Sequence, residues 1–596
     1  MSDSGSRDSG FPPSLFELRR ASGIGSAPIR EAGDSAFLLQ LAAVIDPSVN
    51  ARAIGIAATI AGKRLAGVRD VIPTYRSVAV HFDPLATDVA ALMTAMREAM
   101  DGPPAPREGA LVEVPVSYGG EDGPDLSEVA AFAGLSAQDV IDRHAAVEYR
   151  VFMLGFLPGF AYMGTVDDAI AAPRKATPRT RVPGGSVGIA GRQTGVYPRQ
   201  SPGGWQLIGR TSLPIFDPSR EPASIFAPGD RVRFVPTSGI RDSGFGIRPD
   251  LRSPIATRES RVPSPESRVP NPESRFITVI RPGLFTTIQD SGRWGHQDCG
   301  VPVAGPMDST SHRVANALVG NARDAATLEA TLAGPELRFD QAAVVAVAGA
   351  DLSASIDGAP LPLDTPRACA AGAVMRFGER RAGTRAYLAC DGGIAAPLVL
   401  GSRATHVVSG LGGIDGRALV AGDRLALGDS RGLSQTEEMR RGPFRSAKRG
   451  GARLRIMRGP QDEWFDDAAF EHLLRTRFTI SPQSDRMGYR LKGTPIPRRA
   501  GPFGPAGTGP LGPGGDMISD ATFTGGLQVP PSGDPILLMA DRQTTGGYPQ
   551  MATVITADIP LAGQLAPGDW VEFELCTRQE AVAALIAREG SPGAIG

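Results

Sequence analysis

One short motif occurs twice in this chain, and it limits the fold more than any other feature. It reads R-Q-T-G-V-Y-P from Arg192 and R-Q-T-T-G-G-Y-P from Arg542. Further along, each copy is followed by A-P-G-D and an alternating apolar segment, from Ala227 and from Ala566. Such alternation is typical of a half-buried β-strand. Repeats at long, irregular spacing do not form a solenoid, so they predict two related β-barrels that end near residues 236 and 575.

A weaker copy of the A-P-G-D segment suggests that a third barrel closes in the middle of the chain. It reads V-A-G-D-R-L-A-L-G and begins at Val420. Composition favours the same class, because the 596 residues include 74 Gly and 52 Pro but only 6% aromatic residues. Gly and Pro are well above their average share, which fits turn-rich β structure better than helix bundles.

The N-terminal third shows a different pattern, in which strands alternate with helices. We expect a strand in S-A-F-L-L-Q-L, a helix over 49–62, two strands that meet near 74–77, a helix in D-V-A-A-L-M-T-A-M-R-E-A-M and a strand in L-V-E-V-P-V-S-Y. The order β-α-β-β-α-β is that of a ferredoxin-like domain.

Two segments lack any apolar period. Residues 1–28 are rich in Ser, Gly and Arg, and residues 237–275 carry an E-S-R-V-P repeat whose prolines forbid a helix. We therefore expect a disordered tail (1–28), a ferredoxin-like α+β domain (29–106), a β-barrel (107–236), a disordered linker (237–275), a β-rich domain (276–450) and a second β-barrel (451–596). A Gly/Pro-rich stretch over 501–516 is expected to form a mobile loop or lid.

Charge and residue usage exclude several classes of function. With 62 basic and 63 acidic residues, the chain lacks the basic excess of a nucleic-acid or membrane-surface binder. It has no secretory signal and no run of eighteen apolar residues, so a cytoplasmic protein is expected. Its four cysteines and six histidines form no CxxC, HxH or HExxH, and no structural metal is predicted. A carboxylate-bound Mg²⁺ stays open.

The repeated R-Q-T motif is the leading candidate for catalysis. Its side chains offer hydrogen-bond donors and acceptors beside glycines, where a ligand can approach the backbone closely. The alternative is a pair of tight turns without chemistry. The candidate catalytic residues are Gln193, Thr194 and Tyr197 in the first copy and Gln543, Thr544 and Tyr548 in the second.

Other polar residues are candidates for substrate binding. Arg179 and Arg181 lie, together with Arg174 and Lys175, in a basic loop that could clamp an anion or simply face solvent. Ser186 fits G-x-S-x-G, but no helix pattern follows it as a nucleophile elbow requires. The remaining candidates stand beside turns; they are Asp290, Arg486 and Asp541.

Longer stretches resemble two known families. The first half contains V-F-M-L-G-F-L-P-G-F-A-Y-M-G and R-V-P-G-G-S-V-G-I-A-G-R-Q-T-G-V-Y-P-R-Q-S-P-G-G-W-Q, and it resembles the allophanate-hydrolase subunit 1 family. The second half contains R-P-G-L-F-T-T-I-Q-D-S-G-R-W-G, S-D-R-M-G-Y-R-L and D-R-Q-T-T-G-G-Y-P-Q-M, and it resembles the subunit 2 family. The whole is similar to a fusion of the B and C subunits of 5-oxoprolinase, to the carboxyltransferase region of urea carboxylase, and to a sporulation-kinase inhibitor with its antagonist.

The resemblance implies a mainly β protein with α+β parts, in which cyclophilin-like barrels follow a small ferredoxin-like domain. It implies ATP-dependent opening of 5-oxoproline, a small-molecule substrate, with ATP and optionally Mg²⁺ as cofactors, a third subunit in trans and an oligomer. The alternatives are carboxyl transfer from carboxybiotin and a non-catalytic kinase-inhibitor complex. The 501–516 stretch departs from the family pattern.

Overall fold

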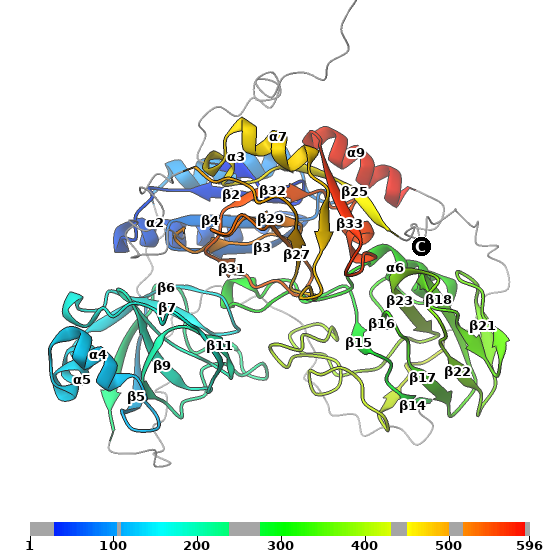
Figure 1. The fold of residues 1–596 in the computed structure, drawn as a ribbon, viewed down its shortest axis with the longest axis horizontal. Helices are drawn as coiled ribbons and strands as arrows, with labels where there is room; N and C mark the ends of the chain where they lie inside the picture. The colour runs from blue at the N-terminus through cyan, green and yellow to red at the C-terminus, as the bar shows by residue number, and fades with distance from the viewer. Residues whose placement is uncertain (1–28, 104–108, 238–274, 431–449, 500–516, 591–596) are drawn as a thin grey trace, which may run out of the picture.

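The computed structural model describes residues 29–103, 109–237, 275–430, 450–499 and 517–590. The chain is mainly β and forms four parts, which lie in two pairs (Figure 1). The N-terminal domain packs beside the last barrel, and the first barrel and the central β-rich domain lie below them. The expected tail, linker and 501–516 loop fall almost wholly outside the described residues, so those expectations stay predictions.

The N-terminal domain has a four-stranded antiparallel sheet with two helices on one face. Its elements are β1 (Ile29–Glu31), β2 (Ala36–Gln40), α2 (Pro47–Gly62), β3 (Val68–Pro73), β4 (Ser77–Phe82) and α3 (Val89–Asp101). The sheet order is β1-β2-β4-β3. The edge position is held by β1, so the β-α-β-β-α-β order, which counted the strand at 111–118, was wrong, whereas the expected bounds of 29–106 and 107–236 place that strand in the barrel. That strand belongs instead to the first barrel.

The first barrel closes with seven strands in the order β10-β7-β6-β13-β5-β12-β9. Its elements are β5 (Leu111–Tyr118), α4 (Leu126–Ala133), α5 (Ala137–Ala145), β6 (Glu148–Leu154), β7 (Ala161–Gly164), η1 (Asp168–Ile170), β8 (Arg179–Val182), β9 (Ser186–Ala190), β10 (Gln193–Val196), β11 (Ser201–Gly203), β12 (Gln206–Arg210) and β13 (Arg231–Pro236). Strand β5 runs parallel to the closing strand β13 along its length, which is why β5 cannot serve the N-terminal sheet.

The second barrel also closes with seven strands, in the order β25-β32-β29-β30-β27-β26-β33. Its elements are β25 (Gly451–Arg458), η3 (Asp462–Trp464), α7 (Asp467–Arg475), β26 (Phe478–Ile480), β27 (Gly488–Lys492), β28 (Asp520–Ala521), β29 (Gly526–Gln528), β30 (Ile536–Leu538), β31 (Thr545–Gly546), β32 (Gln550–Val554), α8 (Ile559–Gly563), β33 (Trp570–Leu575) and the following α9 (Arg578–Glu589). Its first and last strands are again parallel neighbours. The prediction of two related barrels is confirmed.

Matching the barrels strand by strand shows that the two R-Q-T copies are not equivalent in the fold. Starting from β10 and from β30, the circular strand orders coincide, and the accessory pair β8–β11 corresponds to β28–β31. The first copy lies in β10, whereas the second follows β30 and contains β31. The true counterpart of residues 542–550 is therefore residues 199–206, which read R-Q-S-P-G-G-W-Q. The structurally equivalent turns therefore have sequences that are less alike than the two R-Q-T copies.

The central domain is a sandwich of two sheets, not a third barrel. Its elements are β14 (Phe276–Arg281), β15 (Phe285–Gln289), η2 (Gln297–Cys299), α6 (Ser309–Leu318), β16 (Thr327–Thr331), β17 (Glu336–Phe339), β18 (Ala343–Asp351), β19 (Ser355–Ile356), β20 (Ala359–Pro360), β21 (Arg367–Cys369), β22 (Val374–Arg376), β23 (Ala382–Cys390) and β24 (Arg424–Ala426). The sheets run β20-β19-β22-β17-β14-β24 and β15-β16-β23-β18-β21 and share one core. Strand β24 is an edge, so the expected third barrel was wrong.

The three G-D turns nevertheless share one structural role. In each, the aspartate accepts the backbone amide three residues earlier: Asp230 from Ala227 at 2.8 Å, Asp423 from Val420 at 2.8 Å and Asp569 from Ala566 at 2.9 Å. The side chain thereby fixes the turn that precedes a strand. The motif shapes a turn and marks a strand start, whichever sheet receives that strand.

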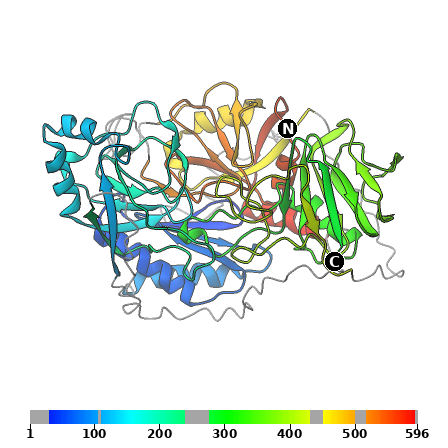
Figure 2. The same ribbon diagram turned by 90° about the horizontal axis from the view of Figure 1, so that it is seen from below.

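The two halves of the chain interlock through the N-terminal sheet. Its helix-free face packs on the second barrel, where Leu38 and Ala79 contact Phe523 in one cluster. Asp34 accepts hydrogen bonds from the Thr556 hydroxyl at 2.7 Å and from its amide at 3.0 Å. The N-terminal sheet and the last barrel therefore lie side by side in both views (Figures 1 and 2). No helix among the described residues is long and apolar enough to span a membrane.

Candidate functional site

The tip of the β3–β4 hairpin, residues 74–77, lies where both barrels meet the N-terminal domain. Strand β4 alternates: Val78, Val80 and Phe82 face the domain's own core, and the residues between them face the second barrel. Tyr75 at the tip is buried and accepts a hydrogen bond from Gln193 Nε2 at 2.5 Å. The first R-Q-T copy therefore contacts this hairpin through Gln193.

The second barrel reaches the same hairpin through Asp520. Its Oδ1 accepts a hydrogen bond from the Ser77 hydroxyl and another from Thr74 Oγ1 at 3.4 Å. Strand pairing sets Asp520 opposite Gly546, inside the second R-Q-T copy. The first copy thus contacts the hairpin directly, and the second lies one strand away from it, behind Asp520.

An aromatic cluster from the first barrel surrounds the tip. Tyr75 stacks at a tilt on Phe152, with ring centroids 5.1 Å apart, and meets the edge of Tyr162 at 6.2 Å. The further members are Phe160, Tyr197 and Trp205, with Ile518 from the second barrel. This cluster forms a small apolar core around the tip, in which a few hydroxyl groups are buried.

The loop between β6 and β7 brings the first barrel against the second. A side-chain carbon at Gly155 would stand 2.1 Å from Thr545 Oγ1, so only glycine allows this approach. The next residue, Phe156, has a φ of 66°, a conformation that costs energy for a bulky side chain. Strained backbone of this kind gathers at functional sites.

The tyrosines of the junction keep their protons at neutral pH. Burial raises the pKa of Tyr75, Tyr162 and Tyr197, and the positive charge of Arg174 opposes the rise at all three. Arg174 is exposed and belongs to the predicted basic loop. The junction therefore offers neutral hydroxyl groups with one cation beside them, an arrangement suited to a small anionic ligand.

Asp520 is the acid of this junction. Burial raises its pKa, while Arg76 and the hydrogen bonds from Ser77, the Ala521 amide and Thr74 oppose the rise. Its Oδ2 is buried and has no hydrogen-bond partner among the described residues. A carboxyl group with a raised pKa and one uncommitted oxygen is suited to proton transfer. No sequence motif marks Asp520, and only its position in the fold singles it out.

The predicted basic residues are divided between structure and surface. Arg179 Nη2 binds Asp125 Oδ1 at 2.6 Å, and Lys175 joins Asp125 at 3.1 Å and Glu128 at 2.7 Å. Arg181 is exposed. The charge of Arg179 is therefore already engaged, which leaves Arg181 and Arg174 as the exposed cations of that loop.

The other residues of the first copy lie deeper in the barrel. Thr194 is fully buried, bonds His144 Nε2 at 2.9 Å and donates to the Gly188 carbonyl at 3.0 Å. Ser186 lies in β9 and is followed by strand β10, so it is not on a strand-to-helix elbow. Tyr197 is the member of the copy that joins Gln193 at the junction.

In the second copy the predicted side chains have different surroundings. Thr544 is buried with no partner for its hydroxyl among the described residues, and Gln543 is half-buried. Tyr548 is half-buried and lines a shallow surface depression with Arg490 and Ile536. Only the strand part of this copy faces the hairpin.

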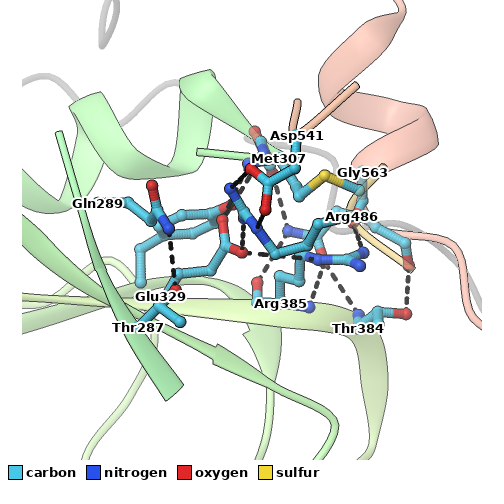
Figure 3. Close-up of polar contacts among 12 residues, drawn as sticks. Thr287, Gln289, Met307, Glu329, Thr384, Arg385, Arg486, Asp541 and Gly563 are labelled. Atoms are coloured by element: carbon cyan, nitrogen blue, oxygen red, sulfur yellow. Dashed lines mark hydrogen bonds and ion pairs between the residues drawn. The ribbon is translucent and has the colours of Figure 1, made fainter. Parts of the chain in front are cut away.

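The last three predicted residues have structural partners. Asp290 accepts from Ser402 Oγ at 2.6 Å and the Gly292 amide at 3.0 Å. Arg486 binds both oxygens of Asp541, at 3.0 and 2.8 Å, and its Nη1 donates a hydrogen bond to Glu329 Oε1 (Figure 3).

Glu329 is the centre of this second network, and sequence reasoning missed it. It is fully buried in β16 and accepts from Tyr387 Oη at 2.6 Å and from the Met307 amide at 2.9 Å. Arg385 stands 3.8 Å away and binds the Gly563 carbonyl at 2.6 Å. The network joins the sandwich to the second barrel (Figure 3) and fixes Asp541, the residue before the second R-Q-T copy.

Comparison with known proteins agrees with this architecture. The family model described as carboxyltransferase domain, subdomain C and D, matches residues 27–226, and that of subdomain A and B matches residues 299–575. The chain is 35% identical to the C subunit of 5-oxoprolinase from Escherichia coli (strain K12) over 310 residues, 52% of this chain and 94% of that protein. It is 42% identical to the B subunit of 5-oxoprolinase from Bacillus subtilis (strain 168) over 221 residues, 35% of this chain and 91% of that protein.

The chain belongs to the carboxyltransferase-domain family of the B and C subunits of 5-oxoprolinase. Its order of family matches is that of a B-type half followed by a C-type half. Urea amidolyase of Saccharomyces cerevisiae is 32% identical over 305 residues, 50% of this chain but 16% of that enzyme. The crystal structure of TTHA0988 superposes with a TM-score of 0.76 at 34% identity, covering 92% of this chain and 100% of that one. The relatives with named activities are enzymes or enzyme subunits.

Proposed function

We propose that this chain is the joined B and C component of an ATP-dependent 5-oxoprolinase, which opens 5-oxoproline to glutamate with a third subunit. The observation that carries the proposal is the near full-length match to both subunit types, 91% of one and 94% of the other. A fusion of two subunits suits an activity that needs both at one place. The junction described above is that place, because each half supplies part of it.

The chemistry must overcome the low reactivity of a lactam. Transfer of the γ-phosphoryl group of ATP to the lactam oxygen releases ADP and activates the ring carbon. Water then adds to that carbon, and the C–N bond breaks as the nitrogen takes a proton. A second water hydrolyses the resulting acyl phosphate to glutamate and phosphate. The protein's part is to hold the reactants and stabilise the developing charge.

We assign roles within the junction on this basis. Arg174 attracts the substrate carboxylate, and the hydroxyl groups of Tyr75 and Tyr162 bind the ring amide. Gln193 orients Tyr75 through their hydrogen bond. Asp520 supplies the proton that the ring nitrogen takes as the C–N bond breaks. The catalytic role predicted for Gln543, Thr544 and Tyr548 of the second copy stays a proposal. In it, strand β31, which pairs with Asp520, is the part of that copy that faces the substrate.

ATP enters as a substrate, and Mg²⁺ would come with its phosphates. No cluster of three or more His, Cys, Asp or Glu side chains among the described residues could hold a metal ion. Mg²⁺ commonly uses substrate phosphates and water as most of its ligands, so ATP chemistry needs no resident metal cage here.

The test is release of glutamate from 5-oxoproline. The purified chain is incubated with ATP, Mg²⁺ and a third 5-oxoprolinase subunit, and glutamate and phosphate are measured together. We expect equal amounts of both, and no glutamate when the third subunit or ATP is omitted. ATP hydrolysis without glutamate release, at any concentration of the third subunit, would contradict the proposal.

Carboxyl transfer from carboxybiotin is the second candidate, favoured by the family description and by the urea amidolyase relatives. It predicts that the chain decarboxylates free carboxybiotin, faster when an amide acceptor such as urea is added. The measurement is the loss of labelled carboxylate from carboxybiotin. Loss of carboxylate from carboxybiotin, together with no glutamate release from 5-oxoproline, would favour carboxyl transfer over the 5-oxoprolinase reaction.

A further inference from the structure

The most unusual side chain outside the proposed catalytic junction is Arg542. It is 1% exposed and is among the largest fully buried side chains of the protein. It makes one hydrogen bond, from Nη2 to Gln297 Oε1 at 2.9 Å, while Nε and Nη1 have no partner among the described residues. Arginine stays charged in proteins, and a buried charge whose hydrogen-bond donors lack partners is destabilising. Such a group needs further acceptor oxygens.

Nearby acidic charge does not supply them. Burial lowers the pKa of Arg542 to about 10, and the carboxylate of Asp70 opposes this change because it favours the charged form. Its oxygens, however, are occupied by the Gly295 amide at 3.0 Å, the Gln297 amide at 3.1 Å and Gln297 Nε2 at 3.0 Å. Arg542 reaches Asp70 only through the Gln297 side chain, which also fixes the direction of that amide.

A second polar group without a partner belongs to the same surroundings. His81 of β4 is 4% exposed, and its Nε2 has no hydrogen-bond partner among the described residues. Its ring lies 5.2 Å from that of Phe523 in the second barrel. Burial first, then the charges of Arg542 and Arg69, hold its pKa well below the ordinary value. His81 is therefore neutral, and in the tautomer with the hydrogen on Nε2 that atom donates a hydrogen bond.

The other buried arginines show what a satisfied guanidinium looks like in this protein. Arg486 is held by two carboxylates and a carbonyl through all three of its nitrogens, whereas Arg293 binds the carbonyls of Val399, Ser402 and Ala404 through two and has no partner for Nη1 among the described residues. Arg542 differs because two of its three nitrogens are uncommitted. It lies between the two halves of the chain, where the N-terminal sheet meets the second barrel and the loop at 295–297.

We propose that Arg542, with His81, binds a small oxyanion of the carboxylate or phosphate type at this contact between the halves. The oxyanion supplies the acceptor oxygens that Nε and Nη1 lack, and charge-assisted hydrogen bonds to arginine are the strong kind. The site does not depend on the proposed 5-oxoprolinase reaction. It would serve a substrate carboxylate, a phosphoryl group or free phosphate equally, because all present the same oxygens.

The experiment measures the melting temperature of the whole chain at constant ionic strength in chloride, acetate or inorganic phosphate. We expect acetate, phosphate or both to raise it for the unchanged protein, and Arg542→Met to abolish that rise. Without an oxyanion, Arg542→Met should melt no lower than the parent, because it removes an unpartnered buried charge. Arg293→Met is the matched control: it should melt lower but keep the rise.

The outcomes separate the oxyanion from its alternatives. A rise with phosphate alone assigns a phosphoryl-type ligand, and a rise with acetate assigns a carboxylate. A rise that Arg542→Met keeps, or no rise in either salt, overturns the proposal, and so does a large fall in melting temperature of Arg542→Met in chloride. His81→Asn is a second test in a protein that keeps Arg542, and its rise should be at least threefold smaller than that of the unchanged protein.

Discussion

The two barrels have one topology, but equivalent turns have opposite surroundings. Arg199 and Arg542 begin corresponding segments, yet Arg199 is exposed and Arg542 is buried. Strand pairing also equates Arg179, opposite Gly203, with Asp520, opposite Gly546. The first is partly exposed and paired with Asp125, and the second is a buried acid. The barrel determines the shape of these turns, and the neighbouring domains determine their chemistry.

The difference follows from what each barrel packs against. The second barrel is covered by the N-terminal sheet on one side and joined to the sandwich through Glu329 and Arg486 on another. The first barrel meets the hairpin and the second barrel mainly through its aromatic cluster. Charged groups are therefore buried in the second barrel's contacts and apolar rings in the first barrel's contacts. The predictions below test this contrast.

The largest effect is expected for Arg486→Met. It leaves Asp541 buried without its cation and Glu329 with Arg385, 3.8 Å away, as the remaining cation, which should lower the free energy of unfolding by about 3–5 kcal/mol. The control in the first barrel is Arg179→Met, whose partly exposed ion pair should be worth about 1 kcal/mol or less. Both are measured by urea denaturation. Equal losses in the two variants would remove the contrast between the barrels.

Measured turnover distinguishes two possible counterparts of Gln543, the one given by the R-Q-T motif and the one given by barrel topology. Gln193→Ala breaks the hydrogen bond to Tyr75 and should lower kcat by about 10²–10³ with a nearly unchanged melting temperature. Gln200 is the topological counterpart of Gln543 and is exposed, so Gln200→Ala should leave kcat unchanged. Gln543→Ala should lower turnover as strongly as Gln193→Ala if the second copy contacts substrate. A large fall in melting temperature for Gln193→Ala would make that residue a structural one.

The pH dependence of stability should have opposite signs at the two acids. Burial raises the pKa of Asp520, so the folded state holds a proton that the unfolded state loses near pH 4. Stability then falls as pH rises from about 4 through the raised pKa, and Asp520→Asn removes that fall. The difference in unfolding free energy between variant and parent should therefore grow with pH.

Asp125 is the control for this sign. Burial raises its pKa, but hydrogen bonds from Arg179, the Leu207 amide and Lys175 outweigh burial and hold the pKa below the ordinary value. Its stabilisation is present above pH 4 and is lost as pH falls through the lowered pKa. Asp125→Asn should therefore cost stability near neutral pH and little in acid. The same pH slope for both variants would refute the assignment.

A smaller effect is expected at the G-D turns. Asp569→Ala removes the side-chain hydrogen bond to the turn before its closing strand and should lower the free energy of unfolding by about 1 kcal/mol. Asp230→Ala removes the same turn hydrogen bond and a second one, from the Ala110 amide at 3.1 Å, so its loss should be about twice as large. Equal losses would show that the second hydrogen bond contributes nothing. The measurement is again urea denaturation.

The smallest effect is expected from cutting the chain between its halves. A protease site introduced within residues 250–270 should leave two fragments that elute together and keep full activity. The contacts of Asp34 with Thr556 and of Asp70 with Gln297 join the halves without the covalent connection. Separation of the fragments on a sizing column would contradict this.

Much of the fold could be predicted from the sequence because it depends on local signals. The expected helix over 49–62 is α2, and Asp308 caps α6 by accepting the Thr310 and Ser311 amides at 3.1 and 3.0 Å. Both closing strands begin at their A-P-G-D turns. The strand at 111–118 was recognised but assigned to the wrong sheet, because alternation predicts a strand and not its partner.

The candidate site was less predictable, and for a different physical reason. The repeated R-Q-T motif predicted Gln193, which does lie at the junction. It paired Gln193 with Gln543, whose turn occupies a different position in its barrel. Tyr75 and Asp520 carry no motif; their importance comes from burial and from contacts between distant segments, Tyr75 with Gln193, 118 positions away, and Asp520 with Ser77, 443 positions away. No local pattern encodes such a contact.

The sequence by itself determined the strands, the helix starts, the two barrels and the membership of the family. Those features follow from side-chain periodicity, from turn residues that set backbone angles and from long motifs. Only the tertiary structure decided which arginine of two similar turns is buried, which aspartate is an acid, and that both halves meet on one hairpin. Burial, charge and pKa depend on what packs against a residue, and here those neighbours come from the other half of the chain.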